Sequence, residues 1–258
     1  MTPHEFAARI RAREKTVGYW VTLDSPAATE RLARLGYDYV CLDGQHGLLD
    51  YAGLLAGLTA IDAGGVSVGL VRVQANDPAQ IGRALDAGAT GVIVPLIDTA
   101  AQAAEAVAAT RYPPAGRRSY GPMRSSLRIG PKPADADATT LVFAMIETAD
   151  GLENVERICR TPGLDGVYVG PSDLCLALGG AYPNDPGVAD VFEDALRRIR
   201  QAAAAAGVAA GIHTPDGETA AKRLAEGYAF ASIASDLVHL EQVARGHLGA
   251  VRSRSQQQ

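Results

Sequence analysis

The sequence predicts a single (β/α)8 barrel, in which eight parallel strands alternate with helices. Short apolar runs alternate with helix-length segments along the whole chain, and Gly or Pro residues separate them. A length of 258 residues suits one such barrel. The alternative, an open doubly wound sheet, is disfavoured because no GxGxxG motif follows the first apolar run. We therefore expect one domain over residues 1–251 and a frayed tail over residues 252–258.

The strands are expected at eight runs rich in apolar and β-branched side chains, as in strands that are buried on both faces. These runs cover residues 17–23, 39–42, 66–73, 92–96, 141–146, 167–169, 208–212 and 230–234. Ser25 and Asp77 each precede a proline, which is typical of a helix start. Gly36, Gly88 and Gly207 stand where the intervening helices should stop.

The composition indicates an ordinary globular protein of the cytoplasm. Hydrophobic residues make up 47% of the chain and charged residues 21%, a balance that allows a sizeable core. A net charge of -5 disfavours nucleic acid and anionic membranes as partners. No apolar stretch approaches membrane-spanning length, and the first residues lack the apolar core of a signal peptide. The three cysteines, an odd number without CxxC spacing, are expected to be reduced and mostly buried.

Two carboxylates follow neighbouring predicted strands at their carboxyl ends. Glu147 comes directly after the fifth run, and Asp173 follows Gly170-Pro171-Ser172 after the sixth. Ligands of α/β barrels bind at this edge, so both side chains are expected at one mouth. Two hard oxygen ligands suit Mg²⁺ or Mn²⁺, although such a pair also serves as acid and base in other enzymes. Backbone N–H groups in the turn before Asp173 are candidates for binding a carboxylate.

A histidine and an arginine are expected at the same mouth. His46 follows the second strand, and Asp43 is close enough in sequence to orient its ring, which favours an acid-base role over a structural one. Arg72 ends an otherwise apolar strand, where a buried guanidinium needs an anionic partner. That partner is either Glu147 or Asp173 in an internal ion pair, or an oxygen of the substrate.

Three other features bear on function. Residues 113–133, with several arginines including Arg118, and with Tyr120, form a long connection that is either a closing or subunit-bridging loop for an anionic ligand or a solvated surface loop. Residues 236–251 form an amphipathic last helix. None of the three lysines ends a predicted strand, so a Schiff-base aldolase mechanism is not expected.

In order along the chain, the runs LDGQHG (42–47), LVRV (70–73), RYPPAGRRSYGP (111–122), AMIETADGLENV (144–155), PGLDGVYVGPSDL (162–174) and GIHTPDGE (211–218) together resemble the HpcH/HpaI aldolase family of metal-dependent pyruvate aldolases. The resemblance implies a barrel whose last helix is exchanged with a neighbouring subunit, commonly in a hexamer built as a trimer of dimers. It also implies Glu147 and Asp173 as metal ligands, with Mg²⁺ or Mn²⁺ expected and Co²⁺ or Zn²⁺ as alternatives.

By the same resemblance, His46 supported by Asp43 is the acid-base residue, Arg72 holds the oxo acid, and the backbone around Ser172 receives the pyruvate carboxylate. The implied reaction is reversible cleavage of a 4-hydroxy-2-oxo acid to pyruvate, or a related 2-oxo acid, and an aldehyde through a metal-stabilised enolate. Two alternatives are a citrate-lyase β-like enzyme acting on a CoA thioester and a non-catalytic 2-oxo acid binding protein.

The chain departs from better-known members of that family at three positions. Gln45 replaces a glutamate beside the histidine, Met145 stands where some members carry a glutamine, and His213 occupies the seventh strand. Because these positions surround the predicted mouth, the metal and base roles transfer, whereas the identity of the aldehyde does not.

Overall fold

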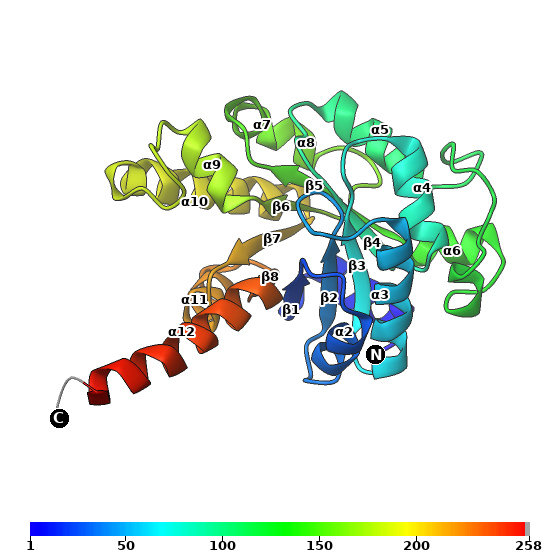
Figure 1. The fold of residues 1–258 in the computed structure, drawn as a ribbon. Helices are drawn as coiled ribbons and strands as arrows, with labels where there is room; N and C mark the ends of the chain where they lie inside the picture. Colours follow the sequence, from blue (N-terminus) through cyan, green and yellow to red (C-terminus); the bar gives the residue numbers. More distant parts are fainter. Residues whose placement is uncertain (256–258) are drawn as a thin grey trace.

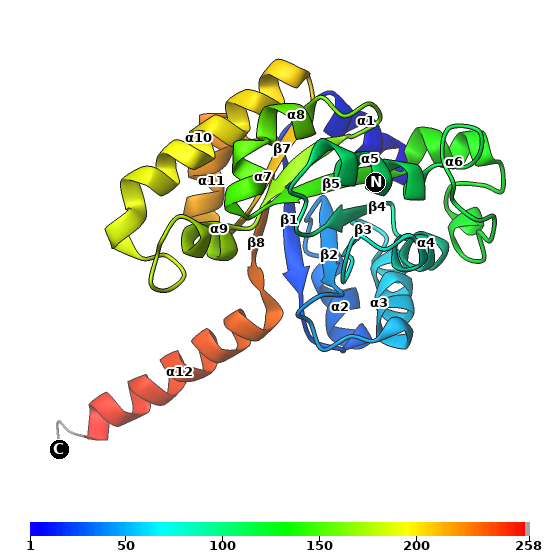
Figure 2. The same ribbon diagram turned by 90° about the horizontal axis from the view of Figure 1, so that it is seen from above.

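The computed structural model describes residues 1–255 and confirms the predicted (β/α)8 barrel (Figures 1 and 2). Eight parallel strands follow one another in chain order, and the barrel closes where β8 pairs with β1. The strands are β1 (Thr16–Val21), β2 (Tyr39–Asp43), β3 (Val68–Arg72), β4 (Gly91–Val94), β5 (Leu141–Ile146), β6 (Gly166–Val169), β7 (Ala209–Thr214) and β8 (Phe230–Ser235).

Every predicted run coincides with or overlaps one of these strands. All residues of β2 to β6 are buried, because one face of each strand points into the barrel and the other packs against the helices. The helices are α1 (Pro3–Arg11), α2 (Pro26–Ala33), α3 (Tyr51–Gly64), α4 (Pro78–Asp86), α5 (Ala100–Thr110), α6 (Pro133–Thr139), α7 (Ala149–Glu153), α8 (Val155–Cys159), α9 (Pro171–Ala177), α10 (Ala189–Ala206), α11 (Gly217–Glu226) and α12 (Asp236–Ser255). Short 3-10 turns cover Ser125–Leu127 and Pro186–Val188.

The predicted helix boundaries are largely confirmed. Asp77 caps α4 by accepting hydrogen bonds from the backbone N–H groups of Ala79 and Gln80. Gly207 ends α10 in the left-handed conformation, at a φ of 76°, which a glycine adopts without strain. Ser25 stands at the cap position of α2 but makes no capping hydrogen bond with its side chain.

Aromatic side chains fill the interior of the barrel, and α1 closes its amino-terminal end. Phe6 and Ile10 of α1 are fully buried, and the Phe6 ring lies 5.7 Å from the ring of Tyr39, the first residue of β2. Deeper inside, the hydroxyls of Tyr39 and Tyr168 both hydrogen-bond to Ser232. The opposite end, where the strands terminate, is therefore the mouth of the barrel.

The long connection between α5 and β5 lies at the amino-terminal end, away from that mouth. Its arginines pair with the last turns of neighbouring helices: Arg118 with Asp86 of α4, and both Arg124 and Arg128 with Asp62 of α3. A connection from a helix back to the next strand must run along this end of a barrel. The prediction that residues 113–133 close over the mouth of their own barrel is therefore wrong, and a subunit-bridging role stays a prediction.

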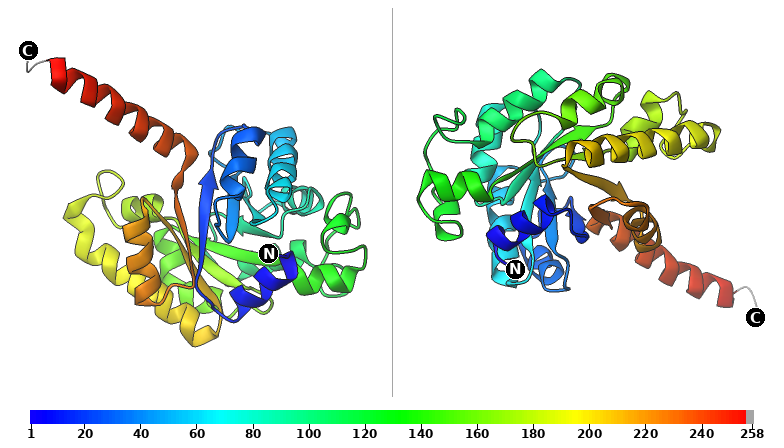
Figure 3. Two further views of the ribbon diagram at one scale, coloured as in Figure 1. Left: turned by 90° about the horizontal axis from the view of Figure 1, so that it is seen from below. Right: turned by 180° about the vertical axis from the view of Figure 1, so that it is seen from behind.

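The last helix, α12, leaves the barrel and projects outward, so that its later turns lie far from the strands (Figures 1 and 3). It continues to Ser255, beyond the predicted end at residue 251, whereas residues 256–258 of the predicted tail lie outside the described residues. The apolar side chains expected on one side of this helix are exposed, as Leu240 (61%) and Val243 (60%) illustrate. The structure of the single chain therefore leaves this apolar surface without a covering element.

Two further predictions concern the chain as a whole. Over residues 1–255, no helix combines the length and the apolar character that are needed to cross a bilayer. Cys41, Cys159 and Cys175 are free and buried, which confirms the expectation of reduced, buried thiols.

Candidate active site

A cavity of about 220 Å³ opens at the mouth of the barrel and brings together most of the residues predicted from the sequence. Residues from β2, β3, β5, β6 and β7 and the turns that follow them meet there. The predicted residues that line the cavity are Asp43, His46, Arg72, Met145, Gly170, Pro171, Ser172, Asp173 and His213. Trp20, Thr22 and Tyr168 line it as well, although the sequence did not single them out, and so does Ser235, which follows the eighth predicted strand.

A buried ion pair between Asp43 and Arg72 forms one wall of the cavity. Arg72 Nε donates to Asp43 Oδ1 at 2.9 Å, and Arg72 Nη2 donates to Asp43 Oδ2. Burial would raise the pKa of the Asp43 carboxyl, but the bonds and charge of Arg72, helped by Trp20 and the His46 backbone, lower it. Within the described chain Arg72 Nη1 donates to no atom, so the pair holds the guanidinium in place with one group free for a ligand.

The partner of Arg72 corrects two predictions. The anionic partner is neither Glu147 nor Asp173, because Arg72 and Asp43 sit at paired positions of β3 and β2 and reach each other directly. Asp43 also does not hold the imidazole of His46. Its Oδ1 accepts instead from the backbone N–H groups of Gln45 and His46, which shapes the turn after β2. The His46 side chain is exposed at the cavity and makes no hydrogen bond with the described residues.

Glu147 lies behind the cavity wall, and Asp173 lies at its edge. Glu147 is only 2% exposed, and its Oε1 accepts from the backbone N–H of Leu96 at 2.8 Å. Burial raises the pKa of Glu147 to about 7; the nearby charge of Asp173 adds to this, while the Leu96 N–H and Arg72 oppose it. The described residues contain no cluster of three or more His, Cys, Asp or Glu side chains suited to a metal. Glu147 and Asp173 are therefore the two acidic side chains that are available here to bind a metal ion.

The turn from β6 into α9 presents two free backbone donors to the cavity. Pro171 occupies the first turn of α9, and Leu174 is the first residue whose N–H bonds back, to Gly170. The N–H groups of Ser172 and Asp173 donate to no other described residue. Gly170 leaves room for the Glu147 and Met145 side chains, since a Cβ at this position would lie 2.5 Å from Glu147 Oε2 and 2.6 Å from Met145 Cε, and both groups would have to move.

Trp20 connects the remaining groups of the mouth. Its Nε1 donates to Asp43 Oδ2 at 3.1 Å, and its ring stacks on Tyr168 with centroids 5.8 Å apart. The Arg72 guanidinium lies 5.2 Å from the Trp20 ring centroid, and the His213 ring meets the same indole edge-on at 5.2 Å. Trp20 therefore fixes the relative positions of Asp43, Arg72 and His213.

Sequence reasoning missed Trp20 because it concentrated on residues after the strand ends, whereas Trp20 lies within β1. One signal was available: this residue is the sole tryptophan of the chain, on a strand whose interior-facing positions alternate. The strand pairing that sets Tyr168 and Ser235 beside it could not be read from the sequence.

Three predicted residues lie elsewhere. Arg118 is buried against Asp86 at the amino-terminal end of the barrel, and the Tyr120 hydroxyl donates to the Pro131 carbonyl of the same loop. Both belong to the connection 113–133 and lie away from the mouth of their own barrel, so neither closes over that mouth, and a subunit-bridging role stays a prediction. Gln45 lies in the turn beside the site but does not line the cavity, and its Oε1 is buried without a hydrogen-bond partner.

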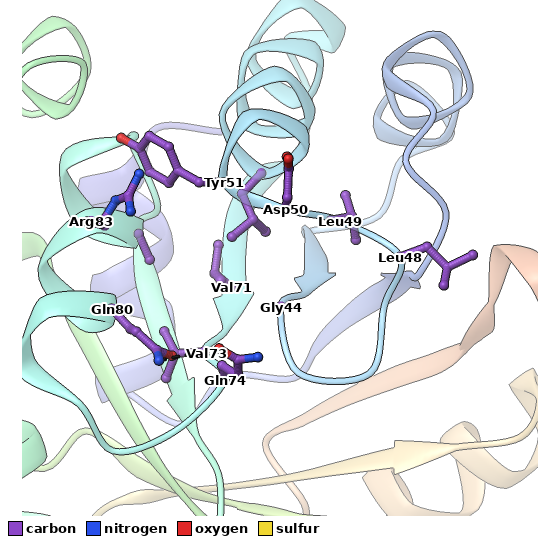
Figure 4. A pocket seen from close by; sticks show the side chains of 12 residues that line it. Gly44, Leu48, Leu49, Asp50, Tyr51, Val71, Val73, Gln74, Gln80 and Arg83 are labelled. Atoms are coloured by element: carbon purple, nitrogen blue, oxygen red, sulfur yellow. Dashed lines mark hydrogen bonds between the residues drawn. The ribbon is translucent and has the colours of Figure 1, made fainter.

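A second cavity, of about 620 Å³, lies beside the mouth between β3 and the helices α3 and α4 (Figure 4). Leu48 and Leu49 of the turn after β2 line one side, and Tyr51 and Arg83 line another, with the guanidinium 3.7 Å from the ring centroid. It shares no lining residue with the cavity at the mouth, because Val71 and Val73 face outward from the barrel while Arg72 faces inward.

Comparison with known proteins agrees with this architecture. Residues 16–242 match the model of the family HpcH/HpaI aldolase/citrate lyase. The chain belongs to this family. Hydroxypyruvate/pyruvate aldolase of Rhizorhabdus wittichii is 42% identical over 91% of the chain and 93% of its own length. The 5-keto-4-deoxy-D-glucarate aldolase of Klebsiella pneumoniae is 37% identical over 91% of each chain.

A solved structure supports the same assignment. The HpcH/HpaI aldolase/citrate lyase family protein of Burkholderia cenocepacia superposes with a TM-score of 0.85, at 35% identity, over 96% of this chain and 99% of its own. The predicted family is thereby confirmed, and with it the prediction of an aldolase, an enzyme of the carbon–carbon lyase class. The roles of individual site residues stay predictions.

Proposed function

We propose that this aldolase reversibly cleaves a 4-hydroxy-2-oxo acid into pyruvate, or a related 2-oxo acid, and an aldehyde, with a divalent metal ion as cofactor. The observation that carries the proposal is the convergence of Arg72, His46, Asp173 and the free N–H groups of α9 on one small cavity. The names of similar aldolases, which refer to hydroxypyruvate, pyruvate and 5-keto-4-deoxy-D-glucarate, support the same substrate class.

Glu147 and Asp173 fit a divalent ion by their chemistry. They are hard oxygen donors. Besides burial, the charge of Asp173 makes ionisation of Glu147 less favourable, and a cation held by these two residues would offset that repulsion. Mg²⁺ or Mn²⁺ suits two carboxylates with the rest of the shell from water and substrate, and Co²⁺ or Zn²⁺ is an alternative. When bound, such an ion acts as a Lewis acid on the oxygens of the oxo acid.

The residues of the chain then have separate tasks. The N–H groups of Ser172 and Asp173 bind the carboxylate of the oxo acid, and Arg72 Nη1 donates to its keto oxygen. His46, directly or through a water, takes the proton from the 4-hydroxyl. The C3–C4 bond breaks, its electrons remain on the oxo acid as an enolate, and the aldehyde leaves. Protonation at C3 completes the formation of pyruvate.

The alternative of a CoA thioester substrate has less support. The phosphates of CoA need a basic surface, and the arginines of residues 113–133 were the candidates. Arg118, Arg124 and Arg128 are instead paired with Asp86 and Asp62 at the far end of the barrel.

We also propose that the protein is a homo-oligomer, a hexamer arranged as a trimer of dimers, in which α12 packs on a neighbouring copy. The exposed apolar side chains of α12 and its projection from the barrel support this arrangement (Figure 3).

A coupled assay of pyruvate release from a panel of 4-hydroxy-2-oxo acids tests the proposed reaction. EDTA treatment or Glu147→Gln should remove activity, and His46→Ala should lower turnover by about a hundredfold or more. His4→Ala, at an exposed histidine of α1 that does not line the cavity, is the matched control and should keep activity. Unchanged pyruvate release after EDTA and in Glu147→Gln would contradict the metal-dependent mechanism, and full turnover in His46→Ala would contradict the assigned base.

A further inference from the structure

Of the two histidines that line the cavity, His46 has a task in the proposed reaction and His213 has none. It stands near the carboxyl end of β7, and its ring lines the cavity. The edge-on contact with Trp20 fixes the ring orientation. Nδ1 is buried and has no hydrogen-bond partner, and Nε2 makes no hydrogen bond to any described residue but is not among the buried atoms. The ring therefore offers one accessible nitrogen to the cavity.

The protonation state of the ring defines what that nitrogen can do. Burial, together with the charge of Arg72, lowers the pKa of His213 to about 4, so the ring is neutral at pH 7. A neutral imidazole carries one proton. A buried N–H without an acceptor is rarer in proteins than a buried acceptor without a donor, so the proton belongs on Nε2 and Nδ1 keeps its lone pair. Nε2–H is then an uncharged donor that points into the cavity.

The position of His213 in the barrel indicates which part of the substrate its ring contacts. β7 is the neighbour of β6, and the turn after β6 carries the N–H groups of Ser172 and Asp173 that bind the carboxylate of the oxo acid. His46, which serves the 4-hydroxyl, lies on the other side of the cavity, after β2. In the proposed orientation of the substrate, a group on β7 therefore lies closer to the oxo acid half, which includes C3, than to the aldehyde.

We infer that His213 is a specificity-determining residue, whose Nε2–H donates a hydrogen bond to a hydroxyl group at C3 of the oxo acid. The favoured donor is then 3-hydroxypyruvate or another 3-hydroxy-2-oxo acid, and the favoured substrate for cleavage is a 3,4-dihydroxy-2-oxo acid. This inference rests on the proposed function for the orientation of the oxo acid. A neutral donor suits a hydroxyl, since the carboxylate and keto oxygens already have N–H groups and Arg72 as partners.

The sole tryptophan provides a direct measurement of binding, because Trp20 lies in the cavity and contacts His213. With Mg²⁺ present and no aldehyde, tryptophan fluorescence is titrated with pyruvate and, separately, with 3-hydroxypyruvate. The wild-type protein should bind 3-hydroxypyruvate about tenfold more tightly than pyruvate, the ratio that one net hydrogen bond supplies. His213→Phe keeps an aromatic ring beside Trp20 and should reduce the ratio to about one. His213→Gln, which keeps an N–H donor, should restore part of it.

The matched control is His239→Phe, the same substitution at a histidine that bonds to Tyr19 but does not line the cavity, and it should leave the ratio unchanged. A wild-type preference that persists in His213→Phe, or a wild-type protein without any preference, overturns the inference. This experiment measures binding without turnover, so a preference for 3-hydroxypyruvate that is lost in His213→Phe and kept in the control supports the role of His213. If in addition no aldehyde yields product in an activity assay, that second result contradicts the proposed reaction but not the role of His213. Failure of the wild type to bind either acid overturns both.

Discussion

Asp43 is the residue on which the geometry of the mouth depends most. Its two carboxylate oxygens receive Arg72, Trp20 and two backbone N–H groups of the turn that carries His46. Asp43 is 2% exposed and Arg72 7%, so neither charge has access to much water. Removing one member of a buried ion pair leaves the other uncompensated, which costs far more than breaking a pair at the surface.

We predict that Asp43→Asn lowers the free energy of unfolding at pH 7 by about 3 kcal/mol, measured by urea denaturation. Because the folded-state pKa of Asp43 is lowered, the pair contributes stability above the ordinary carboxyl pKa of about 4 and loses it as the pH falls through the folded value. The difference between wild type and variant should therefore be largest at neutral pH and shrink in acid, where the wild-type carboxyl becomes protonated as well.

Glu156→Gln is the matched control, since Glu156 pairs with Arg198 on the surface, where both side chains are more than 40% exposed. This change should alter the free energy of unfolding by less than about 1 kcal/mol. If Asp43→Asn and Glu156→Gln lowered the free energy of unfolding equally, the buried Asp43–Arg72 pair would contribute no more to stability than the surface pair.

At this scale the sequence identified most of the polar residues at the mouth, but not their partners. Arg72, Glu147 and Asp173 were found because a polar residue at the end of an apolar strand stands out. The choice of Asp43 as partner of Arg72 depends on the register between β2 and β3, and the isolation of the His46 ring depends on the turn conformation. Neither the strand register nor the turn conformation can be predicted from the spacing of residues in the sequence. Trp20 was overlooked because an aromatic residue within a strand is usually core.

At the scale of elements, the start of α9 packs closely against the end of β5. Gly170 leaves room for the Glu147 carboxylate and the Met145 methyl group. The two atoms nearest to an added Cβ lie at the ends of these side chains and Glu147 Cβ lies at 3.1 Å, so an added methyl would move the Glu147 carboxylate and the Met145 methyl group. A methyl group at position 170 should therefore lower the catalytic activity more than the free energy of unfolding.

We predict that Gly170→Ala lowers kcat/KM for pyruvate release by at least about tenfold, because displacement of a site group by about 1 Å is enough for such losses. Gly82→Ala, in the interior of α4, is the matched control: a Cβ there meets no atom within 4 Å. It should keep activity and raise the free energy of unfolding by about 0.5 to 1 kcal/mol, since alanine is the better helix former. Full activity in Gly170→Ala would show that Glu147 tolerates displacement.

The strands were the elements best predicted from the sequence, because burial on both faces leaves long apolar runs such as residues 141–146. The prediction that the connection 113–133 closes over the mouth fails, because composition does not reveal which helix ends its arginines contact. The topology did contain that information: a segment that follows a helix and precedes a strand runs at the amino-terminal end of the barrel.

At the scale of the whole molecule, α12 is the feature that a single chain leaves incomplete. Its apolar side chains are exposed, and proteins seldom leave such a surface uncovered. The proposed oligomer, like the predicted cytoplasmic location, is a prediction that the structure of one chain does not test.

We predict that Leu240→Asp reduces the molar mass measured by light scattering during size-exclusion chromatography, because a charge on the apolar side opposes packing on a second copy. Gln242→Asp adds the same charge to an exposed polar position of the same helix and should leave the mass unchanged. Equal masses for wild type and Leu240→Asp would argue against a role for α12 in assembly.

The carboxylate of Asp236 ties the start of α12 to the barrel, beside the hydrogen bond between His239 Nδ1 and the Tyr19 hydroxyl. Asp236 Oδ1 accepts from the backbone N–H and the hydroxyl of Thr22, each at 2.8 Å, and Oδ2 accepts from the N–H of Leu23. These bonds tie the first residue of the helix to the end of β1 and so fix the direction in which it leaves the barrel. In an assembly built through this helix, that direction sets the rotation from one copy to the next. Copies related by a rotation that divides a full turn form a closed ring, and any other rotation produces an open filament. The hydrogen bonds of Asp236 and His239 at the start of α12 would thus help to set the angle on which finite assembly depends.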